Sequence, residues 1–161
     1  MHDPRYDQLA TLLTSHSTRI EPGENVLIEA VDIPDEMVIA LIKAIRLRGG
    51  HPLVTLKHNR IQRELMRSTD DEGTNLGLIG EVEAFRMERI QAYIALRGSH
   101  NIAELSDVPT EAMRHYETRW LRPVHFDIRV PRTKWCVLRW PTASMAQQAD
   151  QSTEAFESFY F

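Results

Sequence analysis

Histidine is the side chain best suited to bind a metal or move a proton near neutral pH, and this sequence of 161 residues contains seven. They stand at His2, His16, His51, His58, His100, His115 and His125. No two are four residues apart beside a usable glutamate, which is the spacing that presents two zinc ligands on one helix face. We therefore expect no metal site within this chain, and we expect each histidine to be exposed or locally hydrogen-bonded.

Carboxylates offer a second possible chemistry, because two of them can share acid and base roles. Glu81, Glu83 and Glu88 lie in a stretch with helical spacing that also contains Arg86 and Arg89. Opposite charges three or four residues apart stabilise an exposed helix face. We therefore interpret these residues as a solvated face and not as a catalytic dyad.

The loop Arg97-Gly98-Ser99-His100-Asn101 follows an apolar run that predicts a buried strand. In open α/β folds, ligands bind at the carboxyl ends of the strands. We expect Ser99 or Asn101 to cap a helix there, and the functional alternative is that Ser99, His100 and Asn101 contact a small ligand. The glycines do not form a dinucleotide fingerprint, because Gly49-Gly50 follows a helix and Gly73 to Gly80 is expected to be a polar loop.

The elements around this loop alternate between strands and amphipathic helices. Strands are predicted at residues 24–31, 52–57, 92–97 and 134–140. Helices are predicted around Leu9 to His16, from Asp32 or Pro34 to the stop at Gly49-Gly50, at 60–90 with a break near 70–80, and at 110–121. A strand, helix, strand sequence places its two strands parallel, so we predict a three-layer α/β/α domain with a mainly parallel sheet of about four or more strands.

Residues 142–161 are predicted to be helical, with Thr142 as the cap of a short helix to Ala149 and Ser152 or Thr153 as the cap of a second helix. Phe156, Phe159 and Tyr160 share one face of the last helix. An aromatic face of this kind needs a partner, so we expect it to contact another domain or a second copy of the chain. On this basis residues 1–161 are expected to be the amino-terminal domain of a longer protein. The alternative is that the aromatic residues fold back on the domain's own sheet.

Composition limits the partners and the compartment. The chain is 42% hydrophobic and 26% charged, which suits one soluble domain, and its net charge of -4 provides no general attraction to nucleic acid or an anionic membrane. Apolar runs fall short of the roughly 20 residues that cross a bilayer. Cys136 is the only cysteine, lies within an apolar strand and is expected to be inert, which fits a reducing compartment and hence the cytoplasm. Arg129 to Lys134 is locally basic and is expected to be a solvated connection.

Several motifs near the carboxyl end resemble the amino-terminal region of the thermophilic-type metallo-aminopeptidases, the aminopeptidase T and aminopeptidase S family. They are Arg139-Trp140-Pro141-Thr142, Met145-Ala146-Gln147, Ser152 to Glu157 and Phe159-Tyr160-Phe161. Weaker similarity lies in Pro22-Gly23-Glu24, Leu96 to Ser99 and Thr133-Lys134-Trp135. The chain departs from the family at Asp150-Gln151 and at Ser158, where an aspartate is usual.

The resemblance implies a cytoplasmic, homodimeric metallopeptidase that removes amino-terminal residues from peptide substrates. It also implies two divalent metal ions, held by residues of a separate carboxyl-terminal catalytic domain, so no metal ligand or catalytic residue is assigned to this chain. The chain alone is then expected to be inactive and to supply scaffold and enclosure. The alternative is a freestanding α/β module that binds a small anionic ligand at Ser99 to Asn101.

Overall fold

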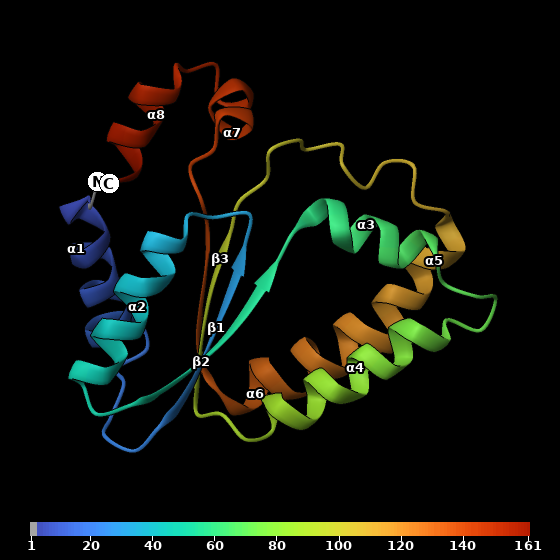
Figure 1. Ribbon diagram of the computed structural model, residues 1–161, viewed down its shortest axis with the longest axis horizontal. Helices are drawn as coiled ribbons and strands as arrows, with labels where there is room; N and C mark the ends of the chain where they lie inside the picture. The colour runs from blue at the N-terminus through green and yellow to red at the C-terminus, as the bar shows by residue number, and fades with distance from the viewer. Residues whose placement is uncertain (1–2) are drawn as a thin grey trace.

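A computed structural model describes residues 3–161, and its centre is a parallel sheet (Figure 1). The strands within that part of the chain are β1 (Asn25–Val31), β2 (His51–Lys57), β3 (Ala92–Arg97) and β4 (Lys134–Arg139). They pair in the order β2-β1-β3-β4, and every pairing is parallel. Each predicted strand is thus present within about one residue of its expected ends.

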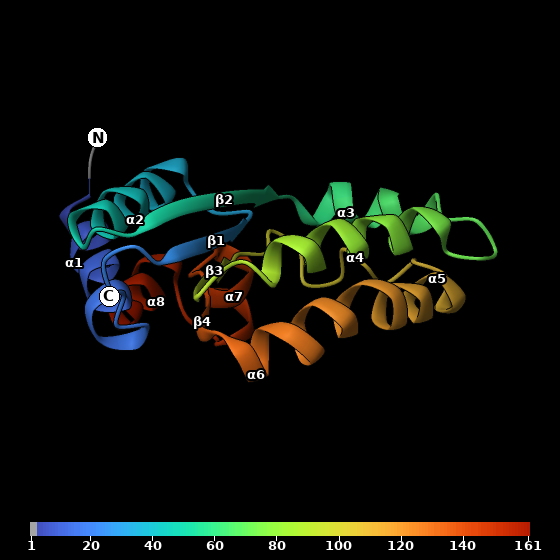
Figure 2. The ribbon, with the colours of Figure 1, turned by 90° about the horizontal axis from the view of Figure 1, so that it is seen from below.

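Helices cover both faces of this sheet, as Figures 1 and 2 show. On one face lie α1 (Pro4–Leu12), its π-helical continuation η1 (Leu13–Ser17) and α2 (Asp35–Leu47). On the other lie α3 (Asn59–Arg67), α4 (Thr74–Met87), α5 (Thr110–His115), the π-helical η2 (Tyr116–Arg129) and α6 (Val130–Arg132). The predicted three-layer α/β/α architecture is confirmed. In the described part of the chain, no helix is long and apolar enough to cross a membrane.

Strand side chains alternate between two apolar cores, because neighbouring residues of a strand point to opposite faces. Val26 and Ile28 of β1 pack in one core with Leu41 of α2. Leu27 packs in the other core with Tyr93 of β3 and Trp120 of η2. Cys136 of β4 is half-buried beside the first core, and burial raises the pKa of its thiol.

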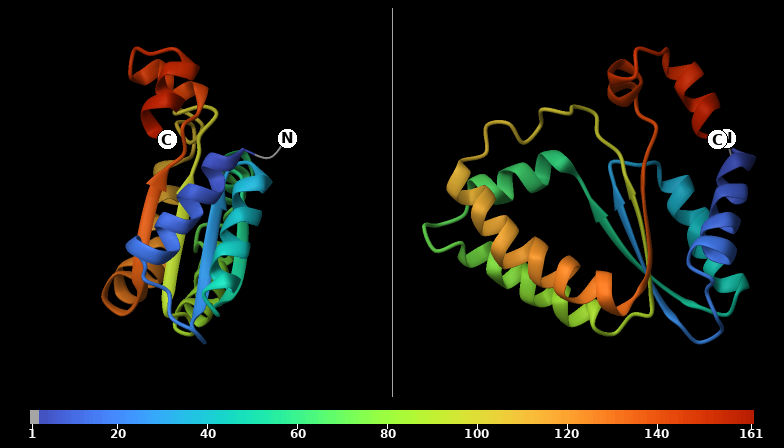
Figure 3. Two further views of the ribbon diagram at one scale, coloured as in Figure 1. Left: turned by 90° about the vertical axis from the view of Figure 1, so that its left-hand side faces the viewer. Right: turned by 180° about the vertical axis from the view of Figure 1, so that it is seen from behind.

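The predicted loop over Gly73 to Gly80 is wrong, because α4 begins at Thr74 and carries Gly77 and Gly80 within it. A Cβ at Gly80 would lie 2.1 Å from the carbonyl oxygen of Arg119. The glycine therefore lets α4 lie directly against η2, and the two helices run side by side in every view (Figure 3). Tertiary packing outweighs the low helix propensity of glycine here.

The helix predicted to end at Leu121 continues through Pro123 and ends at Arg132. Proline cannot donate the usual helical hydrogen bond, and π-helical segments accommodate such interruptions. The prediction that Arg129 to Lys134 form a solvated connection is therefore also wrong. Arg129 is buried, with its guanidinium 5.2 Å from the Tyr93 ring centre and 4.6 Å from that of Trp135.

After β4 the chain forms α7 (Ala143–Gln148) and α8 (Thr153–Tyr160). The Ser152 cap is confirmed, since its Oγ accepts a hydrogen bond from the backbone N–H of Ala155 at 3.1 Å. Thr142 is the N-cap residue of α7, but its side chain accepts no backbone N–H of that helix; its Oγ1 donates instead to the carbonyl oxygen of Ser99 at 2.7 Å. The side chain of Ser144 donates to the same carbonyl.

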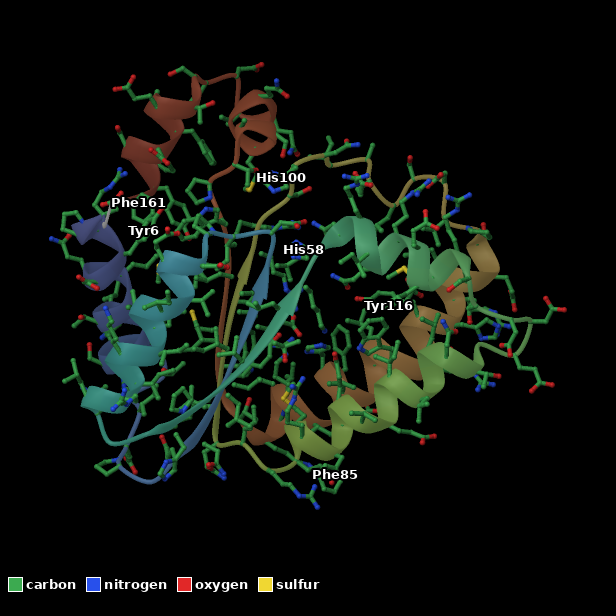
Figure 4. All side chains as sticks on the ribbon, viewed as in Figure 1. Tyr6, His58, Phe85, His100, Tyr116 and Phe161 are labelled. Atoms are coloured by element: carbon green, nitrogen blue, oxygen red, sulfur yellow. The ribbon has the colours of Figure 1, made fainter. Side chains whose placement is uncertain are left out.

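The aromatic residues of α8 do not share one environment. The rings of Tyr160 and Phe161 lie 6.1 and 5.7 Å from Trp140, and Phe161 also contacts Tyr6 (Figure 4). Phe156 is half-buried, whereas the side chain of Phe159 is 80% exposed. Tyr160 thus packs on its own domain, and the contact of Phe156 and Phe159 with a partner stays a prediction.

Candidate functional site

Charged side chains form a row across the carboxyl end of the sheet. Strand register aligns Val31 of β1 with Lys57 on one side and Arg97 on the other, and Arg97 in turn with Arg139. Aligned residues of neighbouring strands point to the same face. The last residues of β2, β3 and β4 therefore present two guanidinium groups and an ammonium group to the face covered by α3, α4 and η2.

Glu29 lies one pleat below this row and is almost fully buried. Its carboxylate accepts hydrogen bonds from Lys57 Nζ and Tyr93 Oη, both at 2.9 Å, and from Arg97 Nη2 at 3.4 Å. Burial alone would raise the pKa of Glu29, but the nearby positive charges, above all that of Lys57, lower it to about 2. Glu29 is therefore a permanent anion beneath the row.

Lys57 joins this carboxylate to a second one. Its Nζ lies 2.8 Å from Oε1 of Glu83, whose Oε2 accepts a hydrogen bond of 2.7 Å from the indole N–H of Trp120. Burial would lower the pKa of Lys57, but Glu29 and Glu83 raise it above its usual value. The interpretation of Glu83 as part of a solvated face is thus wrong, because it holds a buried cation between two helices and the sheet.

His125 of η2 is the next member of this cluster, and it belongs to the helix layer that covers this face of the sheet. Its Nδ1 accepts a hydrogen bond of 3.0 Å from Nε of Arg129, which can only donate, so Nε2 must carry the proton of the neutral ring. Burial, together with neighbouring cations, lowers the pKa of His125 to about 4 despite the opposing charge of Glu29. At neutral pH this histidine is an uncharged donor.

Glu29, Glu83 and His125 offer one ligand atom each, all within 4.8 Å of one another, which is a spacing that could suggest a metal. The surroundings of these three side chains do not fit a metal ion. The ammonium group of Lys57 already lies 2.9 and 2.8 Å from the two carboxylates, and Nδ1 of His125 is already bonded to Arg129. A divalent ion would have to displace the buried lysine cation, so we assign this cluster a structural role.

A cavity of about 240 Å³ opens beside the cluster at the sheet edge, and Ser99 and Asn101 are among its lining residues. Oγ of Ser99 donates to the carbonyl oxygen of Asn101 at 2.9 Å, and Oδ1 of Asn101 accepts from the N–H of Ala103 at 3.0 Å. The residues that follow form successive turns and not a helix, so neither side chain is a helix cap. Ligand contact by Ser99 and Asn101 stays a prediction.

His100, the third residue predicted to contact a ligand, lines neighbouring hollows and not this cavity. There it is accompanied by His58, whose Nδ1 lies 3.0 Å from Oδ1 of Asp32 (Figure 4). Oδ2 of Asp32 accepts from the backbone N–H of Asn59 at 3.0 Å, which fixes the carboxylate. At the carboxyl edge of the sheet, Ser99 thus lines the cavity, His100 lines the neighbouring hollows, and Asn101 lines the cavity and one of these hollows.

His16 and His51 are exposed, as expected. His115 is buried, with its Nε2 3.1 Å from the carbonyl oxygen of Asp71. His2 lies outside the described residues.

Sequence reasoning missed Glu29, Lys57, Glu83 and His125, although a signal for two of them was present. Glu29 interrupts an otherwise apolar strand, and Lys57 ends one, as Arg97 and Arg139 do. Unpaired charge is costly inside a sheet, so such residues predict ion pairs between strands. Which strands are neighbours, and hence which charges meet, depends on the strand order.

The fold is shared with a solved structure. Wild-type AmpT from Thermus thermophilus superposes with a TM-score of 0.68 at 19% sequence identity, over 88% of this chain and 37% of that chain. This chain therefore spans little more than a third of AmpT. A putative LacI-family transcription repressor from Corynebacterium glutamicum gives a TM-score of 0.37 at 13% identity, over 83% of this chain and 61% of that chain, too low to support an argument.

Among curated proteins, no sequence match was found. The family described as thermophilic metalloprotease (M29) matches over residues 2–161, almost the entire sequence. The match agrees with the motifs at Arg139 to Thr142 and at Phe159 to Phe161, and with the fold shared with AmpT. This chain belongs to the thermophilic metalloprotease family M29.

Proposed function

We propose that this chain is the amino-terminal α/β scaffold domain of a metal-dependent aminopeptidase and helps to enclose its active site. The observation that carries the proposal is the match to AmpT, which takes in 88% of this chain but only 37% of AmpT. A protein as long as AmpT would contain a further domain beside the one that this chain forms. The peptide substrate, the homodimer and the cytoplasmic location are parts of the same proposal.

The residues of this chain support a scaffold role and not a metal-binding role. Metalloproteases depend on a divalent ion, two in the parent proposed here, which supplies an activated water for hydrolysis. In the described residues, the carboxylate and histidine group best placed for an ion is already held by Lys57. The ligands of the parent's metal ions are therefore proposed to lie in its carboxyl-terminal catalytic domain.

The segment after β4 supports the enclosing role. Trp140 follows the last strand directly, and the side chains of Thr142 and Ser144 both bond to the carbonyl oxygen of Ser99. These bonds fix the start of α7 at the carboxyl edge, beside the cavity and the hollows (Figure 1). A domain connected through α7 and α8 would thus be anchored at that edge.

The test is the size and activity of the native gene product. An antibody raised against residues 1–161 should precipitate, from cells that carry the gene, a polypeptide well over twice this length. The precipitate should release amino-terminal residues from peptides, and a chelator should abolish the activity. A native polypeptide of only 161 residues, or a longer one without aminopeptidase activity, would contradict the proposal.

The freestanding binding module remains the alternative function, and one observation favours it. Ser99 and Asn101 both line a cavity, as that hypothesis requires. A native product of 161 residues that binds a small ligand would establish this alternative in place of the first.

A further inference from the structure

The cavity at the sheet edge contains two guanidinium groups with unused hydrogen-bond donors. Arg97 and Arg139 are aligned on neighbouring strands, and both line it. With residues 3–161 considered, Arg97 forms one ion pair, at 3.4 Å with Glu29, and Arg139 forms none. A guanidinium group carries five N–H donors in a planar fork that matches a carboxylate. Arg97 also interacts with the Tyr93 hydroxyl group, and within residues 3–161 neither guanidinium group has a further ion-pair partner, so donors remain available on both.

His125 adds a third donor, which is independent of the arginine residues. Its side chain lines the cavity although the residue is only 4% exposed. Because Nδ1 accepts from Arg129, the proton is on Nε2, and this N–H has no hydrogen-bond acceptor among the residues described. Nε2 is not among the buried side-chain atoms that lack a partner, so this N–H is open to the cavity, where a ligand or solvent can accept its hydrogen bond.

The other charges of the wall leave this donor set available. Lys57 is balanced by Glu29 and Glu83, which both lie within 3 Å of its Nζ. Glu104 is the remaining acidic side chain in the wall and is half-buried. The three cations Lys57, Arg97 and Arg139 are thus matched in number by Glu29, Glu83 and Glu104, and it is the unused guanidinium donors, not an excess of positive charge, that favour an anion.

The remainder of the wall indicates what kind of anion fits. Met66, Ile102, Leu105 and Trp120 supply apolar surface next to the arginine pair. The volume of about 240 Å³ is below that of a typical drug-sized pocket. An inorganic ion would leave the apolar surface uncovered, whereas a small organic acid would cover it.

We propose that this cavity binds a small organic carboxylate. Its oxygen atoms accept hydrogen bonds from Arg97, Arg139 and His125. Its apolar part lies against Ile102, Leu105 and Trp120. The proposal concerns these residues alone and does not depend on the domain role proposed above.

The experiment measures binding to the purified 161-residue chain by titration calorimetry. N-acetyl-leucine supplies a carboxylate with an apolar side chain, N-acetyl-leucinamide is its uncharged match, and inorganic phosphate is an anion without an apolar part. We expect N-acetyl-leucine to bind, the amide not to bind detectably, and phosphate to bind more weakly than N-acetyl-leucine.

Three variants test whether N-acetyl-leucine binds in this cavity. Arg139→Gln removes an exposed guanidinium group and should weaken N-acetyl-leucine binding about 10- to 100-fold, because a charge-assisted bond is lost. Glu104→Gln removes the opposing carboxylate and should strengthen binding. Arg132→Gln, the same charge change on the exposed end of α6, is the matched control and should leave binding unchanged.

The opposite signs expected for Arg139→Gln and Glu104→Gln separate a local effect from loss of folding. The proposal is overturned if the folded chain does not bind N-acetyl-leucine, if the amide binds equally well, or if phosphate binds as tightly. It is also overturned if Arg139→Gln and Arg132→Gln have the same effect.

Discussion

Lys57 and Glu29, from adjacent parallel strands, place an ammonium nitrogen 2.9 Å from a carboxylate oxygen in the interior of the domain. The side chain of each is about nine-tenths buried, so this pair is largely protected from solvent screening. The lysine cation fills the position that a metal ion would need between Glu29 and Glu83. This one contact both stabilises the sheet edge and makes Glu29 and Glu83 a poor fit for a metal ion.

Glu29→Ala should lower the free energy of unfolding by about 3 to 5 kcal/mol, because it leaves the buried ammonium group with one partner fewer and removes the acceptor of Tyr93. Urea unfolding followed by circular dichroism measures the change. Glu117→Ala, on an exposed part of η2, is the control and should stay within roughly 0.5 kcal/mol of the parent. Equal effects of both variants would show that the buried network does not stabilise the fold.

His125 should make the chain less stable in mild acid. Its pKa falls from 6.5 to about 4 on folding, so below pH 6.5 the unfolded chain takes up the proton first. By pH 5 the loss should reach about 2 kcal/mol, and His125→Gln should remove most of this difference between pH 7.5 and pH 5. An unchanged pH dependence in the variant would contradict the buried, neutral histidine.

A separate loss of stability is expected from Glu29 at lower pH. A carboxylate with a lowered pKa stabilises the fold above its unfolded value, here 4.5, and this contribution disappears as the pH falls toward about 2. The two pH windows therefore distinguish the histidine from the glutamate.

Gly80 and Gly77 provide a matched pair on α4. Gly80→Ala should destabilise the chain by about 1 to 3 kcal/mol or more, because the new methyl group would lie 2.1 Å from the backbone of η2. At Gly77 the nearest atom would be 3.6 Å away, an ordinary contact, so Gly77→Ala should be neutral or stabilise by up to about 1 kcal/mol. Thermal unfolding of both variants tests the helix packing, and equal effects would contradict it.

Substitutions of Tyr160, which packs on its own domain, and of Phe159, which is exposed, should have different effects. Tyr160→Ala should lower stability by about 2 kcal/mol, because the ring packs on Trp140 and Phe161. Phe159→Ser should leave stability unchanged, since its side chain is 80% exposed, but should reduce self-association in sedimentation experiments. If the parent chain is monomeric at all concentrations, the prediction that Phe159 mediates self-association is wrong.

The fold could be predicted from the sequence because the strands are short apolar runs between helices with clear periodicity. Ala92 to Arg97, for instance, has the bounds predicted for it. The break predicted at 70–80 extends too far, because Gly77 and Gly80 have low helix propensity and yet lie within α4. The close approach of η2, which requires a glycine at position 80, explains why the helix contains it. Contact between helices far apart in the sequence leaves no local signal.

The candidate site was less predictable. The loop at Ser99 and Asn101 could be placed at the carboxyl edge from strand periodicity alone, and it does line the cavity. The charges that matter there come from four strands and two helices, and Glu83 lies on a helix that also carries exposed charges. Only the strand order and the helix packing bring Lys57 between Glu29 and Glu83.

The most direct test of the central claim, that this chain is a scaffold without its own catalytic metal site, is an activity measurement on the chain alone. Purified residues 1–161, shown to be folded by cooperative unfolding, are incubated with divalent metal ions and an aminoacyl chromogenic substrate beside a full-length M29 peptidase. The account predicts release of the chromogenic amine by the full-length peptidase only. Chelator-sensitive release by the 161-residue chain itself would contradict it.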